Sequence, residues 1–165
     1  MSAQVAPAPA ARLALRCISA SALTVFSLAS AQACELLMRD HRSGIELARW
    51  AMNAAQPQIE VAFEHSVLGT TVTDTYRFTP QPVLVQEAFE GTGYGLPVAP
   101  AAGETLRHDG ARSVLTLRRV VDPLVVRNLP AQRMRLLMGE RELLLASLPS
   151  SSIELLAHHC PPAPP

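Results

Sequence analysis

The fold is decided by residues 59–78, which read IEVAFEHSVLGTTVTDTYRF. Apolar residues alternate with polar or small ones along both halves of this stretch, as in half-buried β-strands. The side chains expected to face the interior are Ile59, Val61, Phe63, His65 and Val67 in the first half and Val72, Asp74, Tyr76 and Phe78 in the second. The pattern therefore predicts a β-hairpin that carries an imidazole and a carboxylate, His65 and Asp74, on its apolar face.

If both strands turn their apolar faces toward one core, the residue numbers of each cross-strand pair must sum to an odd number. Two simple registers meet this condition. A two-residue loop at Leu68 and Gly69 places His65 opposite Val72 and diagonal to Asp74. A four-residue loop from Leu68 to Thr71 places His65 directly opposite Asp74. Either register brings the two side chains within reach of a hydrogen bond or one bridging water.

The carboxylate of Asp74 needs a partner if it is buried, and the nearest candidates are His65 and the hydroxyls of Ser66 and Tyr76. One interpretation is that His65 and Asp74 satisfy each other and fix the strand register. The other is that they line a pocket or a partner surface. We expect no metal site and no cofactor, because one His and one Asp are fewer ligands than a protein metal site supplies.

The N-terminus has the features of an export signal, residues 1–33. Arg12 and Arg16 supply positive charge, an apolar segment follows, and Ala31-Gln32-Ala33 forms a small-x-small cleavage site. An uncleaved membrane anchor is disfavoured, because the apolar segment is short and interrupted by serines. Lipid attachment at Cys34 is an alternative, although Ala31 stands where lipid-modified sites usually carry Leu. We therefore expect a periplasmic or secreted protein that meets the membrane only through its signal or such a lipid.

Cys34 and Cys160 remain after signal removal and lie near the two ends of the mature chain. An exported protein can oxidise such a pair to a disulfide, and two unlinked cysteines are the alternative. Residues 161–165 form a proline-rich tail, which we expect to be extended.

The mature chain is expected to be one all-β domain, residues 34–160. Eight to ten short segments with the strand period, separated by turn residues, predict an antiparallel β-sandwich or open barrel. Leu124–Leu129 is expected to be an edge segment. The precursor is neutral, and loss of Arg12 and Arg16 leaves two more acidic than basic residues, which argues against nucleic acid as a partner.

Three motifs resemble the domain-of-unknown-function 1850 family. They are His65-Ser66-Val67, then Val72, Asp74 and Tyr76, then Phe89 with the loop Gly93-Tyr94-Gly95-Leu96-Pro97. Asp74 stands where that family usually has Glu. The resemblance implies a small exported bacterial protein, often associated with tripartite ATP-independent periplasmic (TRAP) transporters of the TAXI type, and it implies no activity.

We expect a non-enzymatic periplasmic accessory or binding protein. Its recognition site would comprise His65, Ser66, Asp74, Tyr76, Gly93, Tyr94, Gly95 and Pro97. This site would recognise a TRAP membrane subunit, its substrate-binding protein or a small solute. Tyr94 is then either packed on the end of the sheet or an exposed contact residue. The alternatives are a small hydrolase that uses His65 with Asp74, and a purely structural envelope protein.

Overall fold

The computed structural model describes residues 34–91 and 100–160, which belong to one compact unit. Eleven strands occur in this part of the chain, one more than the upper end of the expected range. They are β1 Glu35–Asp40, β2 Glu46–Ala51, β3 Gln58–Glu64, β4 Thr71–Thr79, β5 Gln81–Glu90, β6 Thr105–Asp109, β7 Arg112–Val120, β8 Val125–Arg127, β9 Arg135–Met138, β10 Arg141–Leu144 and β11 Ser152–His158. Two short 3-10 helices, Pro130–Gln132 and Leu145–Ser147, join the later strands.

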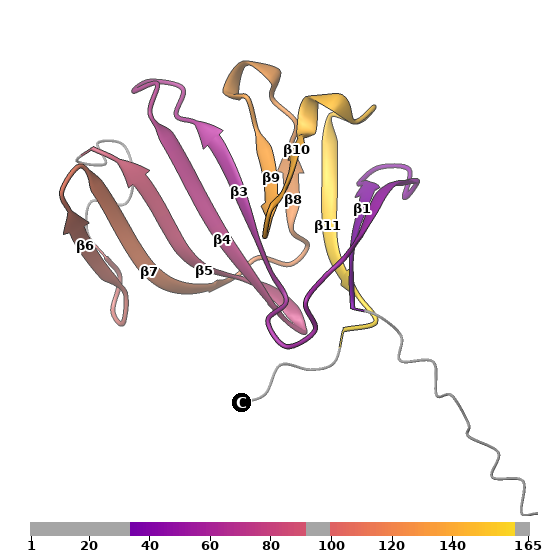
Figure 1. Ribbon diagram of the computed structural model, residues 1–165, viewed down its shortest axis with the longest axis horizontal. Coiled ribbons are helices and arrows are strands. Elements are labelled where there is room, and N and C mark those ends of the chain that lie inside the picture. Colours follow the sequence, from indigo (N-terminus) through magenta and orange to yellow (C-terminus); the bar gives the residue numbers. More distant parts are fainter. Residues whose placement is uncertain (1–33, 92–99, 161–165) are drawn as a thin grey trace, which may run out of the picture. The chain divides into compact units, whose positions relative to one another are not determined.

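The strands form two antiparallel sheets, shown in Figure 1. The four-stranded sheet has the order β2-β1-β11-β8, and the seven-stranded sheet has the order β10-β9-β3-β4-β5-β7-β6. β8 is an edge strand, as expected for Leu124–Leu129. The arrangement is sandwich-like, and the described strands do not close into a barrel. The expected all-β class is therefore confirmed.

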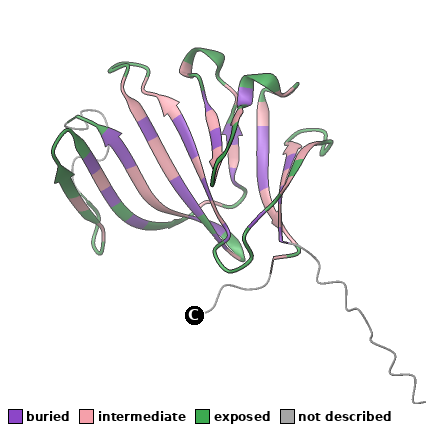
Figure 2. Ribbon diagram, viewed as in Figure 1, coloured by how far each residue is buried: buried purple, intermediate pink, exposed green. Residues whose placement is uncertain are grey.

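The core lies between the two sheets. Leu36 and Met38 from β1 and Ile153 and Leu155 from β11 are buried in the same cluster as residues of the seven-stranded sheet. Those residues include Ile59, Val61, Tyr76, Phe78 and Leu136. Buried and less buried positions alternate along strands such as β1, as Figure 2 shows, so one face of each sheet supplies the core.

A disulfide bond joins Cys34 to Cys160, with Sγ atoms 2.03 Å apart. Cys34 directly precedes β1, and Cys160 lies two residues beyond β11. Because β1 and β11 are paired neighbours, with Glu35 opposite His158, the sheet itself brings the two cysteines together. No helix in the described part of the chain is long and apolar enough to cross a membrane.

Candidate functional site

The hairpin of β3 and β4 has a register that neither expectation gave. Phe63 pairs with Val72 and Val61 pairs with Asp74, so the paired positions do sum to an odd number. The loop, however, is Ser66–Gly69, two residues earlier than the expected four-residue loop. His65 N donates to Thr70 O (2.8 Å) and Gly69 N donates to His65 O (2.9 Å), which closes this loop. Gly69 adopts a φ of +64°, a conformation that favours glycine.

The prediction that His65 contacts Asp74 is therefore wrong. Asp74 lies opposite Val61, and His65 follows Val61 by four residues, about 13 Å along an extended chain. The Nδ1 atom of His65 instead accepts hydrogen bonds from the backbone N of Val67 and of Leu68, each 3.3 Å long. His65 therefore holds the hairpin turn, and the pair required by the hydrolase alternative is not formed.

Asp74 and Tyr76 lie together on the core-facing side of β4, as expected. The Tyr76 hydroxyl donates a hydrogen bond to Oδ2 of Asp74 (3.3 Å), while Oδ1 of Asp74 is buried without a hydrogen-bond partner in the described structure. A carboxyl group is thus held inside an apolar region by one neutral donor. Such a position disfavours the ionised form.

Glu87 on β5 lies directly opposite Asp74. Residues paired in this way have Cβ atoms about 5 Å apart, so the two carboxyl groups share one site. Burial raises the pKa of Asp74 to about 7, repulsion from Glu87 adds to this change, and the Tyr76 hydrogen bond opposes it. Burial also raises the pKa of Glu87, whose Oε1 is likewise buried without a partner. We call Asp74, Tyr76 and Glu87 the carboxyl site.

Glu87 was not among the expected site residues, although the sequence carries a signal for it. Glu87 lies two residues before Phe89, so the strand period places both side chains on one face. Phe89 is buried and lies opposite Val72, another interior residue of β4. A buried phenylalanine two residues away could therefore have identified Glu87 as a core-facing carboxylate.

Two further side-chain pairs lie beyond β5, on the same face of the seven-stranded sheet as the carboxyl site. Arg119 of β7 holds Glu104 through two hydrogen bonds of 2.8 Å. Ser113 of β7 donates to Gly91 O (2.8 Å), so the 2.7 Å contact between its Oγ and Nδ1 of His108 has the imidazole as donor. Ser113 is fully buried and its proton is already used, so this Ser-His pair lacks the arrangement of a nucleophile and its base.

The remaining expected site residues are distributed as follows. Ser66 lies exposed in the hairpin loop, away from the carboxyl site. Gly93, Tyr94, Gly95 and Pro97 lie outside the described residues, and their role stays a prediction. Among residues 34–91 and 100–160, no group of three or more His, Cys, Asp or Glu side chains is arranged to hold a metal ion.

The fold and the carboxyl site define an all-β protein of two antiparallel sheets with a carboxyl pair on the inner face of the larger sheet. Comparison with protein families gives one assignment: the model of the family described as Domain of unknown function (DUF1850) matches residues 59–145, more than half of the chain. The chain belongs to this family, as its motifs indicated. Neither curated proteins nor solved structures gave a match.

Proposed function

We propose that this protein is a non-enzymatic periplasmic accessory protein that binds a component of a TAXI-type TRAP transporter, and that the carboxyl site takes part in recognition. The export pattern of residues 1–33 and the family resemblance support the location and the partner class. The geometry of Asp74, Tyr76 and Glu87 supports a role in binding, because the two paired carboxyl groups offer acceptors to a cationic or hydrogen-bond-donating group.

One observation carries this proposal: two carboxyl groups face each other on an inner sheet surface, and each keeps a buried oxygen without a partner. Burying a polar atom without a hydrogen bond is unfavourable, so such a pair is expected only where it has a use. Both oxygens are closed off from the surface in the free protein, so a cationic group or a hydrogen-bond donor of a partner would satisfy them only once neighbouring side chains move aside. The loop with Gly93, Tyr94, Gly95 and Pro97 stays part of the proposed recognition surface.

Capture of the transporter subunits and the substrate-binding protein by the tagged protein tests the proposal. We expect wild type to capture at least one of them and a D74N/E87Q double variant to lose this capture while its melting temperature is kept or raised. Glu60→Gln is the matched control, since Glu60 lies on β3 but on the opposite face of the sheet from Val61.

Two outcomes would count against the proposal. A folded D74N/E87Q variant that captures the same subunit as well as wild type would remove the carboxyl site from recognition. Wild type that captures none of these components would favour the structural envelope protein instead. A Tyr94→Ala variant with unchanged melting and reduced capture would assign the glycine loop to the contact.

A further inference from the structure

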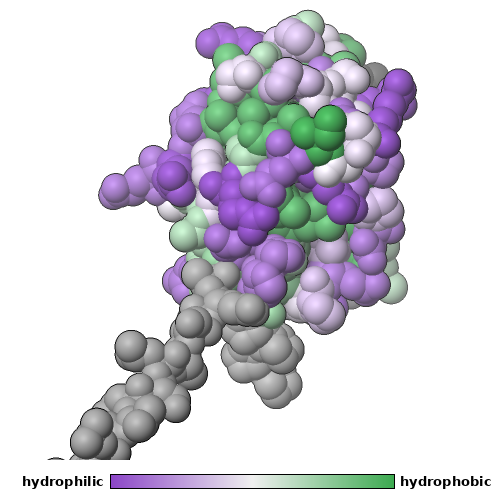
Figure 3. All heavy atoms as spheres, turned by 90° about the vertical axis from the view of Figure 1, so that its right-hand side faces the viewer, coloured by the Kyte–Doolittle hydropathy of each residue, from purple (hydrophilic) through white to green (hydrophobic). Residues whose placement is uncertain are grey.

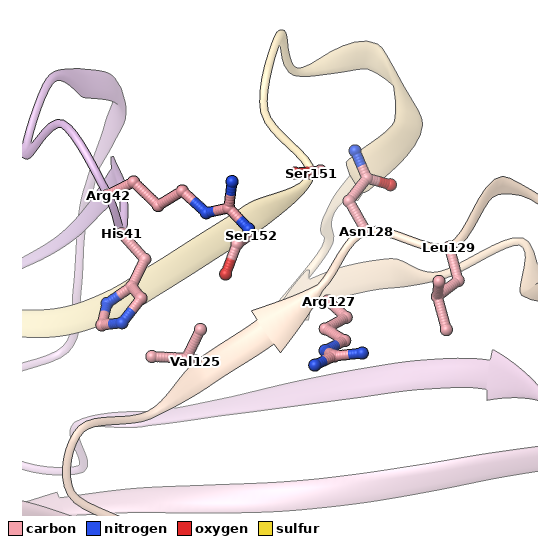
Figure 4. A pocket seen from close by; sticks show the side chains of 8 residues that line it. All are labelled: His41, Arg42, Val125, Arg127, Asn128, Leu129, Ser151 and Ser152. Carbon is pink, nitrogen blue, oxygen red and sulfur yellow. The ribbon is translucent and has the colours of Figure 1, made fainter.

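A cavity lies on the four-stranded sheet, next to its edge strand β8 (Figure 4). Its volume is about 630 Å³. Polar lining groups come from three separate segments: His41 and Arg42 from the β1–β2 turn, Arg127 and Asn128 at the end of β8, and Ser151 and Ser152 at the start of β11. In Figure 4 the side chain of Arg42 extends from its turn toward Ser152. We call this cavity the arginine pocket.

Asp40 and Glu154 lie beside the arginine pocket, and both carboxylates already accept hydrogen bonds from other residues. Glu154 accepts two hydrogen bonds from Arg39 (2.8 and 3.2 Å) and is 3.1 Å from Nδ1 of His41. Asp40 accepts hydrogen bonds from the backbone and hydroxyl of Ser43 and from the hydroxyl of Ser150 (2.6, 2.7 and 2.7 Å). Neither carboxylate lines the pocket.

The two arginines of the pocket keep their charge available. Within residues 34–91 and 100–160, neither Arg42 nor Arg127 forms an ion pair, whereas Arg39, Arg49, Arg119, Arg133 and Arg135 all do. No acidic residue lies in the lining of the pocket. The lining of the arginine pocket therefore carries two arginine charges and no carboxylate, which favours an anionic occupant.

The walls of the pocket are held in place by hydrogen bonds. The side-chain amide of Asn128 donates to Leu145 O (2.8 Å) and to Ser150 O (2.9 Å), and its backbone N donates to Ser151 O (3.0 Å). On the other side, His41 N donates to Ser152 O (2.9 Å). These bonds fix the segments that carry the arginines and serines before any ligand arrives, which lowers the entropy loss on binding.

The lining of the arginine pocket also has an apolar part, which indicates what kind of anion would fit there. Val125 and Leu129 complete the wall, and Leu129 is 43% exposed. Inorganic phosphate would leave this apolar surface uncovered, whereas an organic acid would cover it. Figure 3, which looks at the side of the molecule that lies on the right in Figure 1, shows hydrophilic and hydrophobic surface side by side on that face.

We propose that the arginine pocket binds a small organic carboxylate. Its carboxylate group is held by the guanidinium groups of Arg42 and Arg127 and by the hydroxyl of Ser152, and its hydrocarbon part packs on Val125 and Leu129. This proposal does not depend on the carboxyl site, which lies on the seven-stranded sheet.

Titration of the 15N-labelled protein with sodium hexanoate, followed by NMR at constant ionic strength, tests this site. We expect saturable shifts at the amides of Asn128, Ser151 and Ser152, and no such shifts with the uncharged hexan-1-ol. R42Q and R127Q should each weaken hexanoate binding about tenfold, since each removes a charge-assisted hydrogen bond. Both side chains are exposed, so the variants should keep the wild-type spectrum elsewhere.

Arg77→Gln is the matched control, because Arg77 is an exposed arginine of β4 that likewise forms no ion pair within the described residues. It should bind hexanoate as wild type does. The proposal is overturned if hexanoate causes no saturable shift, or if R42Q and R127Q both bind it as tightly as R77Q. Tighter binding of sodium phosphate than of hexanoate would also overturn it, because the apolar wall would then have no role.

Discussion

The carboxyl group of Asp74 makes the fold sensitive to pH. Its pKa is raised by burial and by Glu87 from 3.8 to about 7 in the folded protein, so the folded state holds this proton more tightly than the unfolded state does. Stability from this group is complete below pH about 4 and is lost as the pH rises through about 7. The change in pKa corresponds to up to about 4 kcal/mol.

We therefore predict that Asp74→Asn stabilises the protein at pH 8 by a few kcal/mol and has little effect at pH 4. Asparagine keeps an acceptor for the Tyr76 hydroxyl and cannot ionise. Urea denaturation at pH 4, 6 and 8 measures the difference, with Glu90→Gln at the exposed end of the same strand β5 as the control. An Asp74→Asn variant that is destabilised equally at all three pH values would show that Asp74 is held by an interaction absent from the structure.

At the scale of single elements, the strands were predictable because their signal is local. Alternation of apolar and polar residues placed Val61, Phe63, Val72 and Tyr76 on one face, and the parity of the hairpin register followed from that. The register itself could not be predicted from this pattern. Different hairpin loops keep the same side chains on the apolar face as long as paired residue numbers sum to an odd number, and such loops differ only in the hydrogen bonds of the turn. The apolar alternation continues to Val67, whereas β3 ends at Glu64 and the chain turns at His65.

The turn role of His65 gives a prediction that separates it from Asp74. His65→Ala should lower the free energy of unfolding by about 1 kcal/mol, because it removes the acceptor for two backbone N–H groups. Denaturant unfolding measures this loss, and Ser66→Ala in the same exposed loop should change stability by less than about 0.5 kcal/mol. NMR titration of the Asp74 carboxyl carbon should give the same pKa in His65→Ala as in wild type. A clear change in that pKa would mean that the two side chains do interact.

In the molecule as a whole, the residues matched by the family model supply only some of the strands that form the core. Apart from the first residue of β3, residues 59–145 contain every strand of the seven-stranded sheet, but of the four-stranded sheet they contain only β8. β1, β2 and β11 come from the flanking segments, and they supply Leu36, Met38, Ile153 and Leu155 to the core. The pairing of β1 with β11 joins distant parts of the chain, so strand periodicity alone could not predict it. The cysteines gave the one hint, because a bond between Cys34 and Cys160 requires these ends to meet.

The disulfide should therefore contribute strongly to stability, because it fixes the two flanks that build the four-stranded sheet. It links residues separated by 126 positions. In the chain-entropy model, a closed loop of this length destabilises the unfolded state by about 4 to 5 kcal/mol. We predict that a C34S/C160S variant loses up to this much free energy of unfolding, measured by urea denaturation. Reductant should lower the stability of wild type to that of the variant and leave the variant unchanged. If wild type is equally stable with and without reductant, pairing of β1 with β11 alone holds the ends together.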